Sequence, residues 1–270
     1  MLERGLGLIG APNARDLGGI VTAGGARVRA GVLSRSTALG RLTDGDVATL
    51  AERKLAWVVD LRDRSEIDAA PADRLPADPA PRIRHIPVFD PEHPVFTYVS
   101  AVLMGHDVAV AAPAASVDGS PGAMVEIYRW MANDAQARAG FGAAVRTIGE
   151  AAGEPLLFHC SAGKDRTGWL TAILFEVLGV DRDTIVADYL ATNDYSRATN
   201  VSIMNAMRAK GRVVHPEHLL PLLEVRPEYL AAAYAEVERG YGGMDRYVRD
   251  GLGVPDDILD ALRDLLLDRP

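Results

Sequence analysis

The chain has 270 residues and a formal net charge of −8 at pH 7. This acidic balance excludes the basic surface typical of nucleic-acid-binding domains, so we expect no nucleic-acid partner. Hydrophobic residues make up 48% of the chain, which excludes a disordered protein and predicts a substantial core. Residues 1–270 are expected to form a single domain, because α/β domains often reach ~250 residues.

The sequence has a single cysteine, Cys160. One cysteine excludes an internal disulfide and a multi-cysteine metal site, and the sequence predicts neither a metal nor a cofactor. Residues 1–8 lack the basic and apolar pattern of a cleavable signal peptide. No apolar run reaches the ~18 residues of a membrane span, so we expect no stable membrane insertion and take the cytoplasm as the default location. The sequence indicates nothing about oligomeric state.

Short apolar runs alternate with helical patterns in the first part of the chain. Residues 31–34, 57–61 and 83–88 are predicted strands, because each is a short, mainly apolar run. Thr43 is the predicted N-cap of a helix, with the acidic Asp46 three places later. Strand, helix and strand at this spacing predict a parallel sheet.

Residues 91–123 interrupt this alternation. The segment 111–122 consists of small and polar residues with Pro and Gly breakers. We expect a lid-like insertion spanning about residues 91–130. Helical periodicity returns over 124–131 and 141–148.

Residues 155–158 form a predicted short strand that leads directly to Cys160. A buried helix follows Thr167 and ends at Gly179. Residues 181–270 are a predicted helical C-terminal portion of the same domain, including helices that start at Pro227 and Pro255. Together these elements predict an α/β fold with a central, mainly parallel sheet flanked by helices.

The segment from His159 to Gly168, with the sequence His-Cys-Ser-Ala-Gly-Lys-Asp-Arg-Thr-Gly, joins this strand to this helix. The first N–H groups of a helix have no partners inside it and lie at the positive end of its dipole, so a helix start attracts anions. Gly163 and Gly168 permit the close turn that such a cradle requires. The residues expected to bind a phosphoryl group are Ser161, Ala162, Gly163, Lys164, Asp165 and Arg166.

Side chains of this loop supply the predicted chemistry. Cys160 stands at the strand end, where the positive field of the helix favours the nucleophilic thiolate. Arg166 offers a planar fork that matches two phosphoryl oxygens. Thr167 is expected to donate a hydrogen bond to the sulfur, and His159 to organise the loop. In-line attack on phosphorus would form a phosphocysteine, and both its formation and its hydrolysis call for a carboxyl group.

The specificity of this motif comes from the whole segment and its place between a strand and an apolar helix. A buried, inert cysteine would not account for the glycines and charged residues crowded at one helix start. A rhodanese-like sulfurtransferase or thiol redox enzyme is a competing hypothesis, weakened by Arg166 and by the lack of a second cysteine. A non-catalytic phosphate-binding module is another.

The loop resembles that of the protein tyrosine phosphatase superfamily, and in particular a bacterial branch with the pattern His-Cys-x-x-Gly-Lys-Asp-Arg-Thr-Gly. Further segments that are similar to this branch are Asn13–Gly19, Ser34–Ser36, Val59–Arg62, Ile185–Leu190 and Arg226–Leu230. The resemblance covers nearly the whole chain outside about 91–123. It implies a tyrosine phosphatase-like α/β domain without a metal, acting on phosphoproteins and also on phosphoinositides.

Lys164 and Asp165 distinguish this branch from ordinary tyrosine phosphatases. The added positive charge suits multiply phosphorylated substrates such as inositol lipids, and the alternative for Lys164 is a solvated loop charge. The branch also includes an enzyme exported without an obvious signal peptide, so export is an alternative to a cytoplasmic location.

Two carboxylates are candidates for general acid and base. Asp165 lies within the loop, close to the expected phosphate. Asp90 follows a predicted strand, aligns with an aspartate proposed as the acid in the family, and borders an insertion that could close over substrate. Either side chain has a structural alternative, Asp165 in capping loop amides and Asp90 in the turn before Pro91. Proximity favours Asp165 slightly.

Other charged residues are expected to have supporting positions. Asp63 follows a predicted strand and is expected at the same edge of the sheet as the loop. Arg15 and Asp16 are expected to form an ion pair that holds the N-terminal segment in place.

Overall fold

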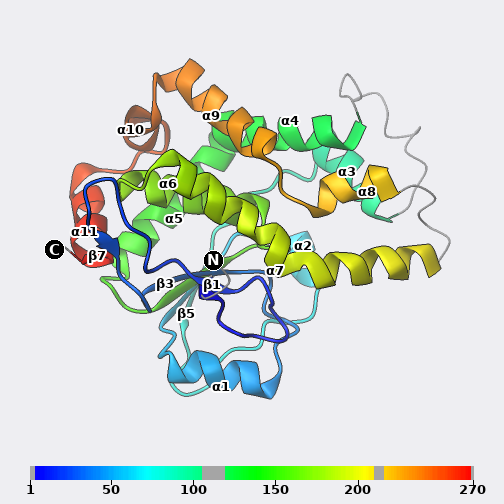
Figure 1. The fold of residues 1–270 in the computed structure, drawn as a ribbon, viewed down its shortest axis with the longest axis horizontal. Coiled ribbons are helices and arrows are strands. Elements are labelled where there is room, and N and C mark those ends of the chain that lie inside the picture. Colours follow the sequence, from blue (N-terminus) through cyan, green and yellow to red (C-terminus); the bar gives the residue numbers. More distant parts are fainter. Residues whose placement is uncertain (1–3, 105–118, 210–215, 269–270) are drawn as a thin grey trace.

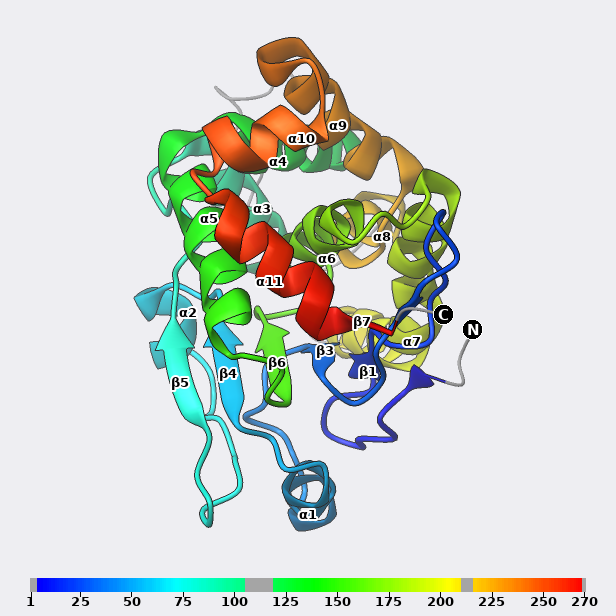
Figure 2. The same ribbon diagram turned by 90° about the vertical axis from the view of Figure 1, so that its left-hand side faces the viewer.

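The computed structural model describes residues 4–104, 119–209 and 216–268. Most of the helices lie on one side of a central sheet (Figure 1). The sheet has five strands in the order β1-β3-β6-β4-β5, which are labelled in Figure 2. The strand bounds are β1 Arg15–Asp16, β3 Leu33–Ser36, β6 Leu156–His159, β4 Trp57–Asp60 and β5 Arg82–His85. β1 runs antiparallel to β3, and the other neighbouring strands are parallel. The predicted fold class, an α/β fold with a mainly parallel sheet flanked by helices, is confirmed.

The central strands β4 and β6 are buried on both faces, which explains their continuous apolar character. Val59 and Phe158 belong to a large core that includes residues of α5 (Ala135–Glu150) and α6 (Asp165–Val177). Val58 and Leu157, one residue earlier, point to the opposite face and join a smaller cluster with α1 (Asp44–Glu52). Figure 2 shows α1 well separated from α5 and α6, with the sheet between them.

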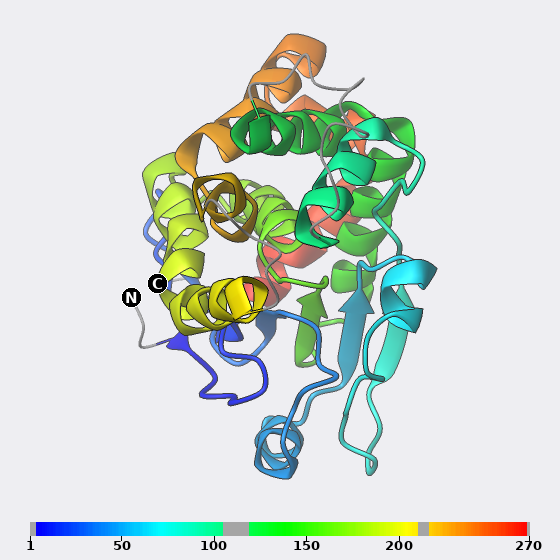
Figure 3. The same cartoon turned by 90° about the vertical axis from the view of Figure 1, so that its right-hand side faces the viewer.

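Further helices surround the sheet, and most of them contribute residues to the larger core. Their bounds are α2 Arg64–Asp68, α3 Pro94–Met104, α4 Gly119–Asn133, α7 Arg182–Ala209, α8 Pro216–Leu223, α9 Pro227–Tyr241, α10 Met244–Arg246 and α11 Asp256–Leu266. A π-helical turn, Tyr247–Gly251, follows α10. Helices α4 and α9 pack side by side (Figure 3). Among the helices of the described residues, none is both long and apolar enough to cross a bilayer.

A second, two-stranded sheet joins segments from the two ends of the described chain. β2 (Arg27–Val28) pairs antiparallel with β7 (Leu267–Asp268). The side chain of Arg29 donates to the backbone oxygen of Leu265 and pairs with Asp268 at 2.8 Å. The helical C-terminal portion is therefore held against the N-terminal part of the chain.

Most predicted element boundaries agree with the structure within a few residues, but two predictions need correction. The strand predicted over 83–88 ends at His85, because Pro87 has no N–H to donate to a β-ladder. Within the breaker-rich segment 111–122, residues 119–122 begin α4, where Pro121 lies in a first turn that needs no N–H donor.

The predicted lid-like insertion over about 91–130 is largely helical where it is described. Its residues 105–118 lie outside the described part of the chain. Phe96 of α3 packs against Phe89 and Trp130, with ring centroids 4.6 and 4.9 Å apart. These contacts attach α3 to α4, and movement of the insertion as a lid stays a prediction.

The N-terminus of α1 provides a test of how local signals stabilise this fold. Asp46 N donates to Thr43 Oγ1 at 3.1 Å and Thr43 N donates to Asp46 Oδ2 at 2.8 Å, which makes a capping box. Thr43→Ala is expected to lower the free energy of unfolding by about 1 kcal/mol, measured by urea denaturation. Thr49→Ala is the matched control in the same helix and is expected to cause no loss, because alanine has the higher helix propensity. An equal loss in both variants would contradict the capping role.

Candidate active site

The strand order places the motif at the centre of the carboxyl edge of the sheet. β6 lies between β3 and β4, and its last residue, His159, is in register with Ser36 and Asp60. Ligands of open parallel sheets bind at this edge. Cys160 follows β6 directly, and α6 begins at Asp165, so the loop is a turn of a few residues between a buried strand and a buried helix.

The loop approaches the neighbouring strand so closely that one position requires glycine. Gly163 has φ of 67°, and a Cβ atom there would lie 2.4 Å from the backbone oxygen of Ser36. The backbone oxygen of Ser161 is held outward by donors from the same region, Thr37 Oγ1 at 2.7 Å and Ala38 N at 3.1 Å. The turn is therefore determined by packing against the segment that follows β3.

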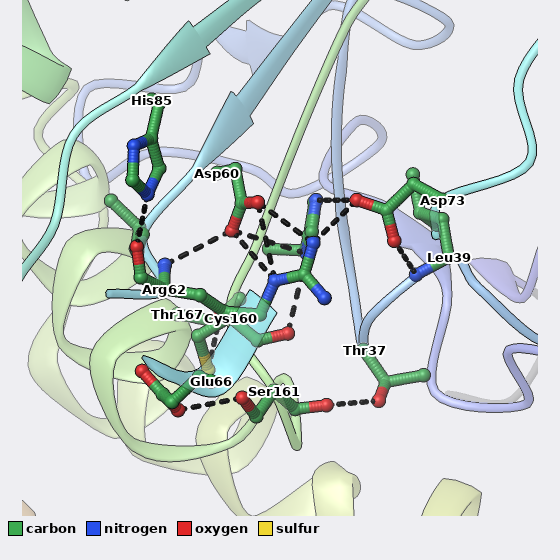
Figure 4. Close-up of polar contacts among 12 residues, drawn as sticks. Thr37, Leu39, Asp60, Arg62, Glu66, Asp73, His85, Cys160, Ser161 and Thr167 are labelled. Atoms are coloured by element: carbon green, nitrogen blue, oxygen red, sulfur yellow. Dashed lines mark hydrogen bonds and ion pairs between the residues drawn. The ribbon is translucent and has the colours of Figure 1, made fainter. Parts of the chain in front are cut away.

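The sulfur of Cys160 is nearly inaccessible to solvent, and the residue is 2% exposed. The hydroxyl of Thr167, in the first turn of α6, donates to Sγ at 3.2 Å, as the sequence led us to expect (Figure 4). A hydroxyl donor stabilises a thiolate, which is a stronger acceptor than a thiol.

The guanidinium of Arg166 is held by a carboxylate that the sequence did not single out. Nη1 and Nη2 donate to the two oxygens of Glu66, each at 2.6 Å, and Ser161 Oγ donates to Glu66 Oε1 at 2.6 Å. Although burial opposes ionisation of Glu66, the hydrogen bonds from Arg166 hold its pKa below the ordinary value. Burial likewise opposes the charge of Arg166, yet its electrostatic interaction with Cys160 and its hydrogen bonds to Glu66 raise its pKa.

Asp165 is bound from two sides at the start of α6. Lys164 Nζ lies 2.7 Å from Oδ2, and the hydroxyl of Tyr128 donates to Oδ1 at 3.0 Å. Burial and the charge of Asp165 raise the pKa of Tyr128 well above its ordinary value, so this phenol stays a neutral donor. Lys164 is only 7% exposed, so it is not the solvated loop charge that the sequence left as an alternative.

Asp90 lies outside the loop. Its Oδ1 accepts a hydrogen bond from Glu92 N at 2.9 Å, which is ordinary turn chemistry. The preceding ring, Phe89, has its centroid 5.7 Å from the guanidinium carbon of Arg166. Asp90 thus follows a residue that borders the loop, and its own side chain is half-buried. Asp63 caps α2 by accepting from Glu66 N at 2.9 Å and so helps to place Glu66.

A buried group of charges supports the loop from the strand side. Arg62 pairs with Asp60 at 2.8 Å and with Asp73 at 2.5 Å (Figure 4). His159 lies beside them, with Nε2 3.6 Å from Asp73, and its Nδ1 lies 3.3 Å from the backbone oxygen of Cys160. Burial lowers the pKa of His159 despite these carboxylates, which favours a neutral ring.

The same group contains a spacing that could hold a metal ion. Among the residues that the structure describes, Asp60, Asp73 and His159 bring potential ligand atoms within 4.8 Å of one another. The guanidinium of Arg62 already pairs with both carboxylates and compensates their charge. The chemistry of this cluster is therefore that of a buried ion-pair network.

The predicted ion pair between Arg15 and Asp16 is wrong. Adjacent residues of a strand point to opposite faces, so these two side chains diverge. Arg15 lies 3.4 Å from Asp188 of α7, whereas Asp16 accepts from Gly18 N and Gly31 N, each at 2.7 Å. Both residues still hold the N-terminal segment in place, through separate partners.

Several residues of this site were missed by sequence reasoning, although some signals were present. Asp63 followed by Glu66 three residues later has the spacing of a capping box, which predicts a helix start but not the contact with Arg166. Asp60 and Arg62 lie in a segment that resembles the family, but the resemblance assigned no role to either residue. Tyr128 lies in a segment with helical periodicity, which predicts no contact with the loop. No motif in the sequence pointed to Asp73.

Known proteins are similar to this chain in sequence. A model described as the tyrosine phosphatase family matches residues 6–268. A Cupriavidus necator protein, provisionally named a tyrosine-protein phosphatase, is 37% identical over 244 residues, covering 90% of this chain and 82% of that protein. The triple specificity protein phosphatase PtpB of Mycobacterium tuberculosis is 32% identical over 277 residues, covering 96% of this chain and 98% of PtpB. The chain therefore belongs to the tyrosine phosphatase family, and its enzyme class is protein-tyrosine phosphatase.

The contact between Glu66 and Arg166 generates a prediction. Glu66→Gln removes the anionic partner of the guanidinium, so kcat/KM for an aryl phosphate is expected to fall about 10- to 100-fold. Glu154→Gln is the matched control, because Glu154 also accepts from an arginine, Arg82 at 2.9 Å, at a site outside the loop. Equal kcat/KM for the two variants would show that Glu66 does not orient Arg166.

Proposed function

We propose that this chain hydrolyses phosphate monoesters through a phosphocysteine intermediate on Cys160, with protein phosphotyrosine as the principal substrate. One observation carries the proposal. The sulfur of Cys160 accepts a hydrogen bond from the Thr167 hydroxyl at the start of α6, and Glu66 holds the guanidinium of Arg166 in the same turn of the helix. A nucleophile, an anion-attracting helix start and an oriented guanidinium thus belong to one short segment.

The first chemical step uses these groups together. The thiolate of Cys160 attacks phosphorus in line, and the ester oxygen leaves as the sulfur–phosphorus bond forms. The N–H groups of residues 161–166 and the guanidinium of Arg166 bind the equatorial oxygens. Water then attacks the phosphocysteine, which releases inorganic phosphate and restores the thiolate.

The two carboxylates are suited to different steps. Asp165 accepts from Lys164 and Tyr128, so its carboxylate is held in a fixed orientation, which suits a base that positions the hydrolytic water. The carboxylate of Asp90 accepts from a turn amide, Glu92 N, and Asp90 follows Phe89 at the border of the loop. We therefore assign protonation of the leaving oxygen to Asp90 and activation of the hydrolytic water to Asp165.

Phosphoinositides, phosphoserine and phosphothreonine are second candidates for substrate. Lys164 adds a positive charge at the helix start, which suits a substrate with more than one phosphate. The relative PtpB is named a triple specificity protein phosphatase, which supports a broad range. Against this, Lys164 is paired with Asp165, so phosphotyrosine stays the principal proposal.

Substrate class and the nucleophile are tested in one panel. Wild type and Cys160→Ser are assayed with an aryl phosphate, a phosphotyrosine peptide, a phosphoserine peptide and phosphoinositide vesicles. We expect turnover by wild type, fastest on the phosphotyrosine peptide, and none by Cys160→Ser. Full turnover by the serine variant would overturn the cysteine mechanism. Phosphate binding without turnover by wild type would favour a binding module, and thiosulfate:cyanide transfer would favour a sulfurtransferase.

The assignment of the carboxylates predicts a kinetic difference between Asp90→Asn and Asp165→Asn. Loss of an acid slows formation of the phosphocysteine, so kcat/KM for Asp90→Asn should fall more steeply as the leaving group becomes more basic. Loss of a base slows the second step, so Asp165→Asn should show a burst of product and a lower kcat with kcat/KM largely kept. The reverse pattern would exchange the two roles.

A further inference from the structure

The N-terminal segment Asn13–Gly19, which resembles the family, has no part in the catalytic steps described above. Asn13 nevertheless reaches the loop, because its Nδ2 donates to the backbone oxygen of Gly163 at 2.9 Å. The side chain is buried, and the contact joins residues 150 positions apart in the sequence. A buried amide committed to one loop carbonyl points to a role in the geometry of the loop.

A second donor converges on the same oxygen. Arg35, the third residue of β3, donates through Nη2 to Gly163 O at 2.9 Å and to Lys164 O at 3.4 Å. Its side chain is fully buried. A carbonyl oxygen has two lone pairs, so Asn13 and Arg35 together satisfy the whole acceptor capacity of Gly163.

Both donors are themselves oriented by buried charges. Arg15 Nη1 donates to Asn13 Oδ1 at 2.5 Å, which directs the amide nitrogen of Asn13 toward the loop. Asp188 of α7 lies 3.4 Å from both Arg15 and Arg35. Burial opposes the charge of Asp188, but these arginines hold its pKa well below the ordinary value, so it stays an anion.

The planarity of the peptide bond gives this arrangement a consequence for phosphate binding. In a trans peptide the C=O and N–H groups of one plane point in opposite directions. Holding Gly163 O toward Asn13 and Arg35 turns the N–H of Lys164 away from them. The N–H of Lys164 is then oriented to bind an anion at the start of α6.

We propose that Asn13 and Arg35 are positioning residues, which fix the Gly163–Lys164 peptide plane so that its N–H faces the bound phosphoryl group. The inference rests on the proposed function for the location of the phosphate. It assigns the N-terminal segment to the anion cradle, with Arg15 and Asp188 as the groups that orient the two donors.

The test measures phosphate binding separately from turnover. Inorganic phosphate is titrated by calorimetry into Cys160→Ser and into Cys160→Ser combined with Asn13→Ala or with Arg35→Lys. We expect the dissociation constant to rise about 3- to 10-fold for Asn13→Ala and about 10- to 100-fold for Arg35→Lys. In the enzymes with Cys160 intact, KM for an aryl phosphate should rise by similar factors, with a smaller change in kcat.

The matched control is Asn193→Ala. Asn193 is also an amide that holds backbone, because it donates to Val225 O at 2.8 Å and accepts from Val225 N at 2.9 Å. It is expected to lower the melting temperature as Asn13→Ala does, with an unchanged dissociation constant for phosphate.

The outcomes separate this proposal from the proposed function. Unchanged phosphate affinity in Asn13→Ala and Arg35→Lys, with a lowered melting temperature, would show a structural role only and overturn the inference. Equal weakening by Asn193→Ala would overturn it as well. Weakened affinity confined to Asn13→Ala and Arg35→Lys supports the inference even if the panel shows that Cys160 is not the nucleophile, because this binding is measured without turnover.

Discussion

The site depends on burying cations next to a sulfur at the end of a strand, and each of these cations has a carboxylate partner. Arg166 pairs with Glu66, and Lys164 pairs with Asp165. Behind the loop, Arg62 pairs with Asp60 and Asp73, while Arg15 and Arg35 share Asp188. Removing a charge from water costs several kcal/mol unless a partner and hydrogen bonds compensate it. The acidic net charge of the chain is thus compatible with the proposed anion site, because carboxylate partners already compensate the positive groups there.

This compensation also prepares the loop for its proposed chemistry. A guanidinium held by Glu66 and stacked near Phe89 does not have to be ordered when a phosphoryl group arrives. The loop carbonyls of Ser161 and Gly163 are bound by donors from the strand side, Thr37 for the first and Asn13 and Arg35 for the second. In the proposed mechanism the amides between them bind the phosphoryl group. In the proposed mechanism the two halves of the site therefore have different tasks: side chains of the loop bind substrate, and buried side chains behind the loop hold its backbone.

Much of the fold could be predicted because its signals are local. Thr43 with Asp46, the apolar strands around Val59 and Leu157, and the prolines at 227 and 255 each specify an element within a few residues. Predictions of element boundaries were wrong where one residue had more influence on the backbone than the pattern around it. Pro87 ended β5 early, and Pro121 was compatible with a helix start although its neighbourhood suggested irregular structure. Arg15 and Asp16 do not form the predicted ion pair, because neighbouring residues of a strand point to opposite faces of the sheet.

The sequence by itself determined the candidate loop, because His159 to Gly168 is one contiguous segment between a strand and a helix. The proposed nucleophile, the guanidinium, the hydroxyl donor and the turn glycines are all present there, and the contact from Thr167 to Cys160 follows from their spacing. Only the tertiary structure decided which distant residues complete the loop. These residues come from four parts of the chain: Glu66 from α2, Asn13 from the N-terminal segment, Arg35 from β3 and Asp188 from α7. Their contacts depend on strand register and helix packing. No local pattern encodes those distances, so the groups that orient the loop became visible only once the sheet and its helices were in place.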